Sequence, residues 1–188
     1  MLRRYGCSHL CMFPLLLLFL VVPPAWGLDD SDLWNAALTK IDSGDLTQAT
    51  TLLDQLVSQY PSSPKAPGAH LKLAYIKVKT SPDATQDLLD AFSLVRTKYA
   101  STPEAGEALV RIGYLHSKSK ETAQAIDDLT TFLTTYSGHS LSAEAQRSLG
   151  NLYLRNLDLD RAEAAFDAVK AIPGAPAEVA GRQYYRKR

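Results

Sequence analysis

The stretch RSLGNLYLRNLDLDRAEAAF, residues 147–166, places a glycine inside an otherwise helical pattern. Gly150 is followed by Tyr153, and Ala162 is followed four residues later by Phe166. Because a glycine in a helix interior costs about 1 kcal/mol relative to alanine, the position needs a compensating reason. We interpret it as a place where two helices approach closely. The alternative, a phosphate-cradling loop, would need a strand before a glycine-rich turn, and the sequence predicts none there.

The same pattern recurs three more times along the chain. The aligned columns are Ala37, Ala74, Gly113 and Gly150; Ala49, Leu88, Ala125 and Ala162; Leu53, Phe92, Leu129 and Phe166; and Leu56, Val95, Phe132 and Val169. The spacings fit four units of 37 residues, with two residues inserted in the second unit around residues 80–84. Such a period is typical of a repeat protein in which each unit packs on its neighbours.

Each unit contains two apolar runs at helical spacing, separated by a polar break such as DSGD at residues 42–45. This pattern predicts an antiparallel helical hairpin. We therefore expect an all-α solenoid of about four hairpins, with units near residues 31–62, 63–101, 102–138 and 139–172, and a short capping helix with a basic tail at 173–188. Within a hairpin, the small column of the first helix is expected to receive the second helix at its own small column.

The motif LGNLY at residues 149–153, with Ala162 and Phe166, resembles the signature of the tetratricopeptide repeat (TPR). The third unit has IGYLH, and the first has GDLTQA followed by Leu53. The tryptophan that opens the family signature is replaced by Leu33, His70, Leu109 and Gln146. The resemblance covers roughly residues 31–172 and implies a protein that binds other proteins.

The unit length exceeds the usual value of about 34 residues, and YPSSP closes the first unit at residues 60–64. These features are similar to the envelope branch of the superfamily, which includes the YbgF/CpoB-type coordinator of the Tol–Pal system and the TPR lipoprotein of the outer-membrane β-barrel assembly machine. The resemblance implies a scaffold or adaptor in a cell-envelope assembly. The coordinator's coiled coil and the lipoprotein's acylated cysteine and fifth repeat have no counterpart here. Two alternatives stay open: an accessory subunit that docks an envelope (peptidoglycan) enzyme, and a self-associating structural module.

Residues 1–27 have the features of a secretory signal peptide. Arg3 and Arg4 precede the apolar run MFPLLLLFLVV at residues 12–22, and small residues stand at Ala25 and Gly27. We expect cleavage near Gly27 and a periplasmic product. An uncleaved anchor is the alternative, although a membrane span needs about 20 apolar residues. Both cysteines precede the run, so the sequence predicts neither a lipoprotein nor a disulfide in the mature chain.

The remaining chain is slightly acidic, because the 20 basic residues balance the 20 acidic ones only when the two leader arginines are included. An acidic body argues against a nucleic-acid partner. Membrane contact is not expected beyond the basic tail, which would either touch anionic lipid weakly or serve solubility.

No motif for catalysis, a cofactor or a metal is evident. The mature chain's histidines, His70, His116 and His139, are too far apart in sequence to form a metal motif, and His116 is expected to be a surface or partly buried residue. No nucleophile elbow or phosphate loop occurs. We expect a protein that is not an enzyme.

The best candidate site is the concave surface formed by the first helix of each unit. Two columns are predicted to line it: Leu38, Tyr75, Tyr114 and Asn151, and, one turn further, Asp42, Lys79, Lys118 and Arg155. Tyrosines beside aligned cations would suit an extended peptide that carries acidic groups or a terminal carboxylate. The alternative is that these are solvated positions, since basic residues near helix C-termini are favoured by the helix dipole. Trp34 has two interpretations, as an anchor for a partner or as a cover for the open end of the solenoid.

Overall fold

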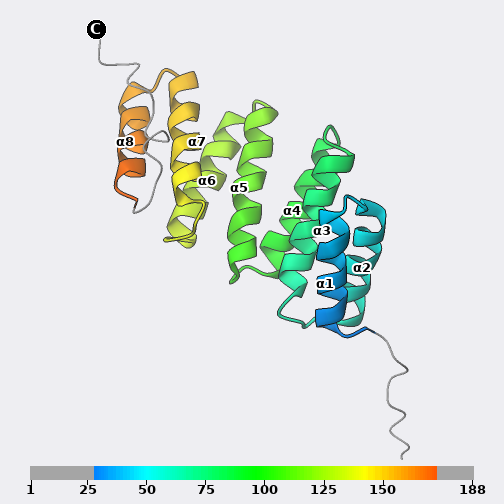
Figure 1. The fold of residues 1–188 in the computed structure, drawn as a ribbon. Helices are drawn as coiled ribbons and strands as arrows, with labels where there is room; N and C mark the ends of the chain where they lie inside the picture. The colour runs from blue at the N-terminus through cyan, green and yellow to red at the C-terminus, as the bar shows by residue number, and fades with distance from the viewer. Residues whose placement is uncertain (1–27, 173–188) are drawn as a thin grey trace, which may run out of the picture.

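The computed structural model describes residues 28–172, which contain eight α-helices and no strand (Figure 1). The helices are α1 (Asp30–Asp42), α2 (Leu46–Gln59), α3 (Ala66–Thr80), α4 (Thr85–Lys98), α5 (Pro103–Lys118), α6 (Thr122–Thr135), α7 (Ser142–Arg155) and α8 (Leu159–Lys170). The all-α prediction is confirmed. The predicted leader and the predicted C-terminal cap and tail lie outside the described residues. None of these eight helices has the length and apolarity to cross a membrane.

Consecutive helices pair as hairpins, α1 with α2, α3 with α4, α5 with α6, and α7 with α8. The hairpins follow one another along a solenoid (Figure 1). Across unit boundaries α3 contacts α5, and α5 contacts α7. The helices α3, α5 and α7 therefore share one face, which we call the first-helix face.

Three of the four hairpins turn through a loop of the same design. Its middle residue has a left-handed backbone, with φ of +81° at Gly44, 64° at Lys120 and 58° at Leu157. Each such loop has three residues, whereas the loop between α3 and α4 has four, residues 81–84, and no left-handed residue. The insertion predicted in the second unit therefore lies partly in this loop. The first helix of that unit, α3, is also longer than α1.

The aligned small residues are buried in the core. Ala37, Ala49 and Ala125 are 0% exposed, and Ala74 and Ala162 are 1% exposed. The large apolar residues Leu53, Phe92 and Phe132 are also buried, whereas Tyr153 and Phe166 in the last unit are partly buried. Burial of the small columns is confirmed, and this burial is the source of the repeat period.

The partner of the small column differs from our expectation. A Cβ placed on Gly150 would lie 2.6 Å from Cε1 of Phe166, and one on Gly113 would lie 3.1 Å from Cγ of Leu129. The glycine therefore receives the large apolar side chain of the second helix and not that helix's own small column. The ring of Phe166 occupies the space that a side chain at position 150 would need, which explains the glycine in the α7 interior.

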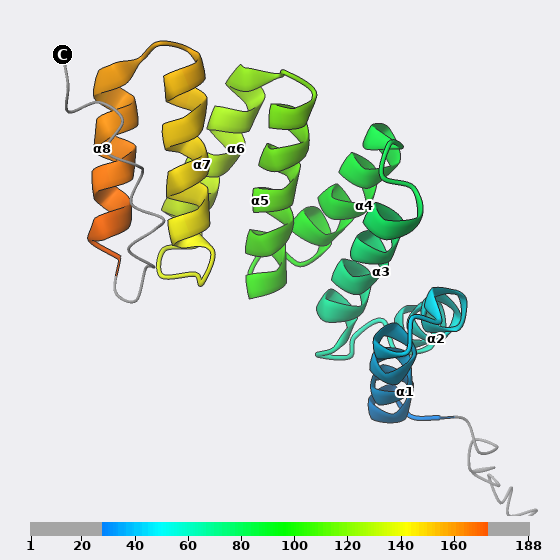
Figure 2. The same ribbon diagram turned by 45° about the horizontal axis from the view of Figure 1, so that its top comes forward.

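The second unit is the irregular one. α3 contacts α4 less extensively than the partners in the other hairpins contact each other, and α1 has at most a marginal backbone approach to α3. Figure 2 shows the α1–α2 hairpin turned away from the rest of the solenoid. The longer α3–α4 loop lies in this same unit, so the change in loop design and the change in packing coincide.

The tyrosines that end the first three units also differ in the second unit, in the hydrogen bonding of their hydroxyls. The Tyr60 hydroxyl donates to the Leu28 carbonyl at 3.1 Å, and the Tyr136 hydroxyl donates to the Ala100 carbonyl at 2.7 Å. The Tyr99 hydroxyl is buried without a hydrogen-bond partner among residues 28–172.

Candidate functional site

A pocket of about 260 Å³ opens on the first-helix face between α5 and α7. Three residues of the predicted groove line it, namely Tyr114, Asn151 and Arg155. Tyr114 is 62% exposed, and Asn151 and Arg155 are also exposed. We call this hollow the α5–α7 pocket.

The lining of the α5–α7 pocket includes a second arginine that the sequence prediction had not assigned to it, and Glu144, which is paired with Arg111. The second arginine is Arg147, and neither Arg147 nor Arg155 forms an ion pair with a described residue. Two guanidinium groups, the Asn151 amide and the Tyr114 hydroxyl can all donate hydrogen bonds to a carboxylate. The arrangement therefore suits an anionic group on a bound segment.

Tyr75, a predicted groove residue, is already engaged within the protein. Its hydroxyl donates to the Glu107 carboxylate and accepts from Arg111 Nε at 2.7 Å. Arg111 continues to Glu144 Oε1, 3.0 Å from its Nη1. Burial of the Tyr75 hydroxyl is the larger cause, and its hydrogen bond to Glu107 the next, that together raise the pKa of Tyr75 to about 12. This polar ladder joins α3, α5 and α7 and leaves the Tyr75 hydroxyl little capacity for a ligand.

The ladder was missed in the sequence prediction, although the sequence holds a signal for it. Glu107 and Glu144 occupy the same position in the third and fourth units. Arg111 stands four residues after Glu107, which is one helical turn further along α5. The bonds connect residues 32 to 36 apart. Opposite charges separated by about one repeat length are the pattern that would have predicted it.

The aligned cations also have a role inside the solenoid. Lys118 Nζ donates to the Pro82 carbonyl at 3.3 Å and lies 3.9 Å from Asp83, and Arg155 Nη2 donates to Ser117 Oγ at 3.1 Å. Each of these two cations thus reaches back to the end of the preceding unit's first helix or to its loop. Lys79 is exposed and makes no such contact with a described residue.

The predicted columns do not form a continuous stripe. Leu38 is half-buried on α1, and α1 scarcely approaches α3. Leu38, Lys79 and Lys118 do not line the α5–α7 pocket.

Trp34 packs between the first two units. A Cβ on Gly68 of α3 would lie 3.0 Å from the outer edge of the Trp34 indole. This places Trp34 at the junction of the first two units and not over the outer end of the solenoid. The large side chain fills space where the α1 and α3 backbones are far apart.

The histidines are held in structural contacts. His116 Nδ1 lies 2.6 Å from Asp128 Oδ2, and Arg96 lies 3.8 Å from the other oxygen of the same carboxylate. Burial raises the pKa of Asp128, which His116 and Arg96 partly counteract. His139 Nδ1 accepts from the Leu141 backbone N–H before α7. Among residues 28–172 no three His, Cys, Asp or Glu side chains are grouped to hold a metal ion.

Two family models match the chain, and both describe the tetratricopeptide repeat. One matches residues 33–63 and the other matches residues 110–176. The chain contains tetratricopeptide repeats. The second unit of this TPR protein falls largely between the two matches, which agrees with its longer loop and altered packing.

Solved structures show the same fold. A tetratricopeptide repeat protein from Parabacteroides merdae aligns with a TM-score of 0.65 and 21% identity, over 81% of this chain and 57% of that one. BtubC from P. vanneervenii aligns with a TM-score of 0.62 and 15% identity, over 81% and 65%. MamA from Desulfovibrio magneticus aligns with a TM-score of 0.56 and 15% identity, over 76% and 75%. The search of curated proteins found no match. The TPR chain thus spans little more than half the length of the Parabacteroides protein.

Proposed function

We propose that this TPR protein is an exported, non-catalytic scaffold that binds an acidic, extended segment of a partner protein in the cell envelope. The observation that carries the proposal is the α5–α7 pocket, where Arg147 and Arg155 stand beside Asn151 and the exposed Tyr114 without forming ion pairs to described residues. Repeat solenoids bind partners on such surfaces. A carboxylate offered by a partner would supply the anion that the two arginines lack.

The envelope location rests on the leader-like sequence of residues 1–27 and on the resemblance of the unit length and YPSSP turn to envelope TPR proteins. The partner is therefore a component of an envelope assembly, with a peptidoglycan enzyme as the alternative. Cell fractionation and the N-terminal mass of the purified protein test this part. A cleaved N-terminus near Leu28 in the periplasmic fraction is expected, and an intact chain in the cytoplasm would contradict it.

The pocket is tested by partner capture with matched variants. Tyr114→Ala with Arg147→Glu removes the aromatic face and reverses one charge, so crosslinked partner should be lost while helical circular dichroism stays unchanged. Lys79→Glu makes the same kind of charge reversal at an exposed residue of α3 outside the pocket, and capture should survive it. Equal loss with both variants, or none with either, would rule out the α5–α7 pocket as the binding site.

The electrostatic part is tested with the same partner. Capture through two guanidinium groups should weaken as ionic strength rises, because salt screens exposed charges. The Tyr114→Ala and Arg147→Glu protein should show a weaker salt dependence than the natural chain. Salt-independent capture would indicate an apolar docking mode and would overturn the assignment of an acidic ligand.

A further inference from the structure

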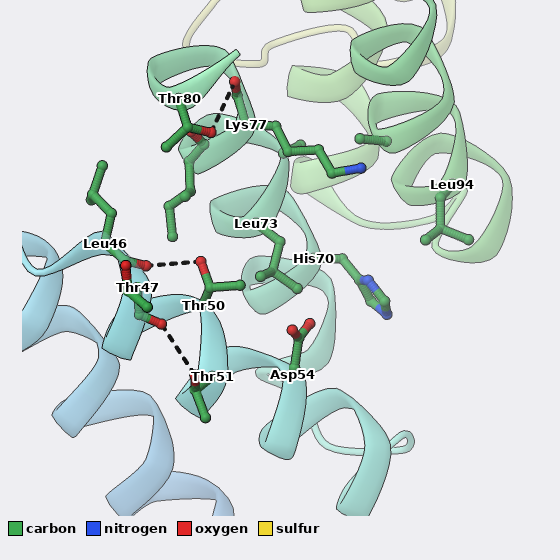
Figure 3. Close-up of a pocket in the computed structure, with 13 residues that line it drawn as sticks. Leu46, Thr47, Thr50, Thr51, Asp54, His70, Leu73, Lys77, Thr80 and Leu94 are labelled. Carbon is green, nitrogen blue, oxygen red and sulfur yellow. Dashed lines mark hydrogen bonds between the residues drawn. The ribbon is translucent and has the colours of Figure 1, made fainter. Parts of the chain in front are cut away.

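A second and larger cavity, of about 630 Å³, lies between α2 and α4, with α3 as its floor (Figure 3). We call it the α2–α4 cavity. Four apolar side chains of its wall are Leu46 on α2, Leu73 and Ile76 on α3, and Leu94 on α4. Leu94 is 46% exposed, which is unusual for a large apolar side chain at a helix interface. The volume falls in the range of about 300–1,000 Å³ found for small-molecule sites.

The cavity exists because the first unit boundary lacks the side chains that fill the next one. Thr50 on α2 aligns with the larger Leu89 on α4, and Ala91 on α4 aligns with Asp128 on α6. At the next boundary Asp128 is bridged to Arg96, 3.8 Å away. Val57 stands in the column of Arg96, so neither side of that bridge is present at the first boundary.

The threonines of the wall add apolar surface to the cavity. The Thr50 hydroxyl donates to the Leu46 carbonyl at 2.8 Å, and the Thr51 hydroxyl donates to the Thr47 carbonyl at 3.1 Å. Thr80 bonds the Ile76 carbonyl in the same way at 3.1 Å. Because these hydroxyls are satisfied by their own helices, they need no partner in a ligand. Figure 3 shows the bonds of Thr50 and Thr51 running back to α2.

Ionisable side chains stand at separate places along the α2–α4 cavity. Lys77 belongs to the last turn of α3, and in Figure 3 its side chain extends on the side of Leu94. It makes no ion pair with a described residue. Asp54 on α2 and His70 near the start of α3 also line the cavity, and burial and the nearby Lys98 lower the pKa of His70. The Lys77 end therefore presents an unpaired positive charge beside an apolar wall.

We propose that the α2–α4 cavity binds a single-chain amphiphile with an anionic head, of the fatty-acid class. The aliphatic chain lies against Leu73, Ile76 and Leu94, and the carboxylate pairs with Lys77. Binding covers the exposed part of Leu94 and supplies the anion that Lys77 lacks. This site lies outside the α5–α7 pocket, and the proposal does not depend on the function proposed there.

Titration calorimetry of the purified protein with dodecanoate, below its aggregation concentration, tests the proposal. We expect one saturable site. Thr50→Leu restores the residue type of the next boundary and should abolish binding, whereas Thr134→Leu, the same change at an exposed residue of α6, should leave it intact. Helical circular dichroism of each variant confirms that the solenoid still folds.

The role of Lys77 is separated from the role of the apolar wall by changing the head group. Lys77→Ala should weaken dodecanoate about 10-fold, the effect of losing one charge-assisted contact, and should not weaken dodecyltrimethylammonium. Lys79→Ala, two residues away and outside the cavity, is the matched control and should bind normally. The proposal is overturned by the absence of saturable dodecanoate binding, by unchanged binding in Thr50→Leu, or by equal losses in the two lysine variants.

Discussion

Single backbone positions carry much of the information that makes this chain a solenoid. Gly44, Lys120 and Leu157 share a left-handed backbone at the hairpin turns, yet only the first is a glycine. The sequence predicts the turns from their polar composition, but it does not distinguish the left-handed residue when a lysine or leucine occupies it. A non-glycine residue in this conformation costs roughly 1–2 kcal/mol.

Replacing Leu157 by glycine should therefore stabilise the protein. Leu157 is 83% exposed, so little packing is lost, and relief of the left-handed strain should raise the free energy of unfolding by about 1 kcal/mol. Urea denaturation followed by circular dichroism measures the change. The control is Asn156→Gly, at a neighbouring residue with φ of −91°, which should give no gain. A loss of stability in Leu157→Gly would contradict the strain argument.

The two helical glycines of the small column should respond differently to alanine. Gly150→Ala brings a Cβ to 2.6 Å from the Phe166 ring, whereas Gly113→Ala brings one to 3.1 Å from Leu129. We expect Gly150→Ala to lower the free energy of unfolding, by about 1–3 kcal/mol, and Gly113→Ala to cost less.

The double variant Gly150→Ala with Phe166→Leu tests the cause, because it recreates the pair found in the first unit, Ala37 with Leu53. Thermal or urea unfolding should show that Phe166→Leu lowers the free energy of unfolding less in the Gly150→Ala background than in the natural chain. Additive losses would mean that Phe166 does not explain the glycine.

At the scale of the helices, periodicity predicts what is repeated and misses what is particular to one boundary. The small and apolar columns predicted the hairpins because every unit needs the same core. The polar ladder from Tyr75 through Arg111 to Glu144 uses charged residues that only some of the units carry. It therefore does not appear in the sequence as a pattern repeated in every unit. Likewise, the α2–α4 cavity depends on the smaller size of Thr50 and Ala91 relative to their aligned residues. Comparison of columns between units would have found both features.

The ladder should contribute more to stability than the exposed cations do. Arg111→Met removes hydrogen bonds to both Tyr75 and Glu144 and leaves the half-buried Tyr75–Glu107 pair without its cation, so we expect a loss of about 1–3 kcal/mol. Lys118→Met removes contacts of an exposed side chain and should cost at most about 1 kcal/mol. Urea denaturation of the two variants gives the comparison. Equal costs would show that the ladder adds nothing beyond surface charge.

Over the whole molecule, the boundary between the first two units differs from the later ones in the packing of its first helices, because α3 contacts α5 and α5 contacts α7. The α1–α2 hairpin is turned away from the other units, α1 scarcely approaches α3, and the α2–α4 cavity lies at this same boundary (Figure 2). In a solenoid, stability is approximately the sum of unit terms and nearest-neighbour interface terms. The junction held by Trp34 and α2 should thus be the first to separate.

The first hairpin should unfold before the rest of the solenoid, and Trp34 reports it directly. In a Trp26→Phe background Trp34 is the one tryptophan of the chain, and it packs on Gly68 across the boundary between the first two units. Its fluorescence should change at a lower urea concentration than the helical circular dichroism, because the signal of the other three hairpins survives the loss of the first. Gly68→Ala should crowd the indole and widen this difference by weakening the junction further. Coincident transitions by the two probes would instead indicate a single cooperative unit, in which the wide α1–α3 gap is compensated by the contacts of α2 with α3.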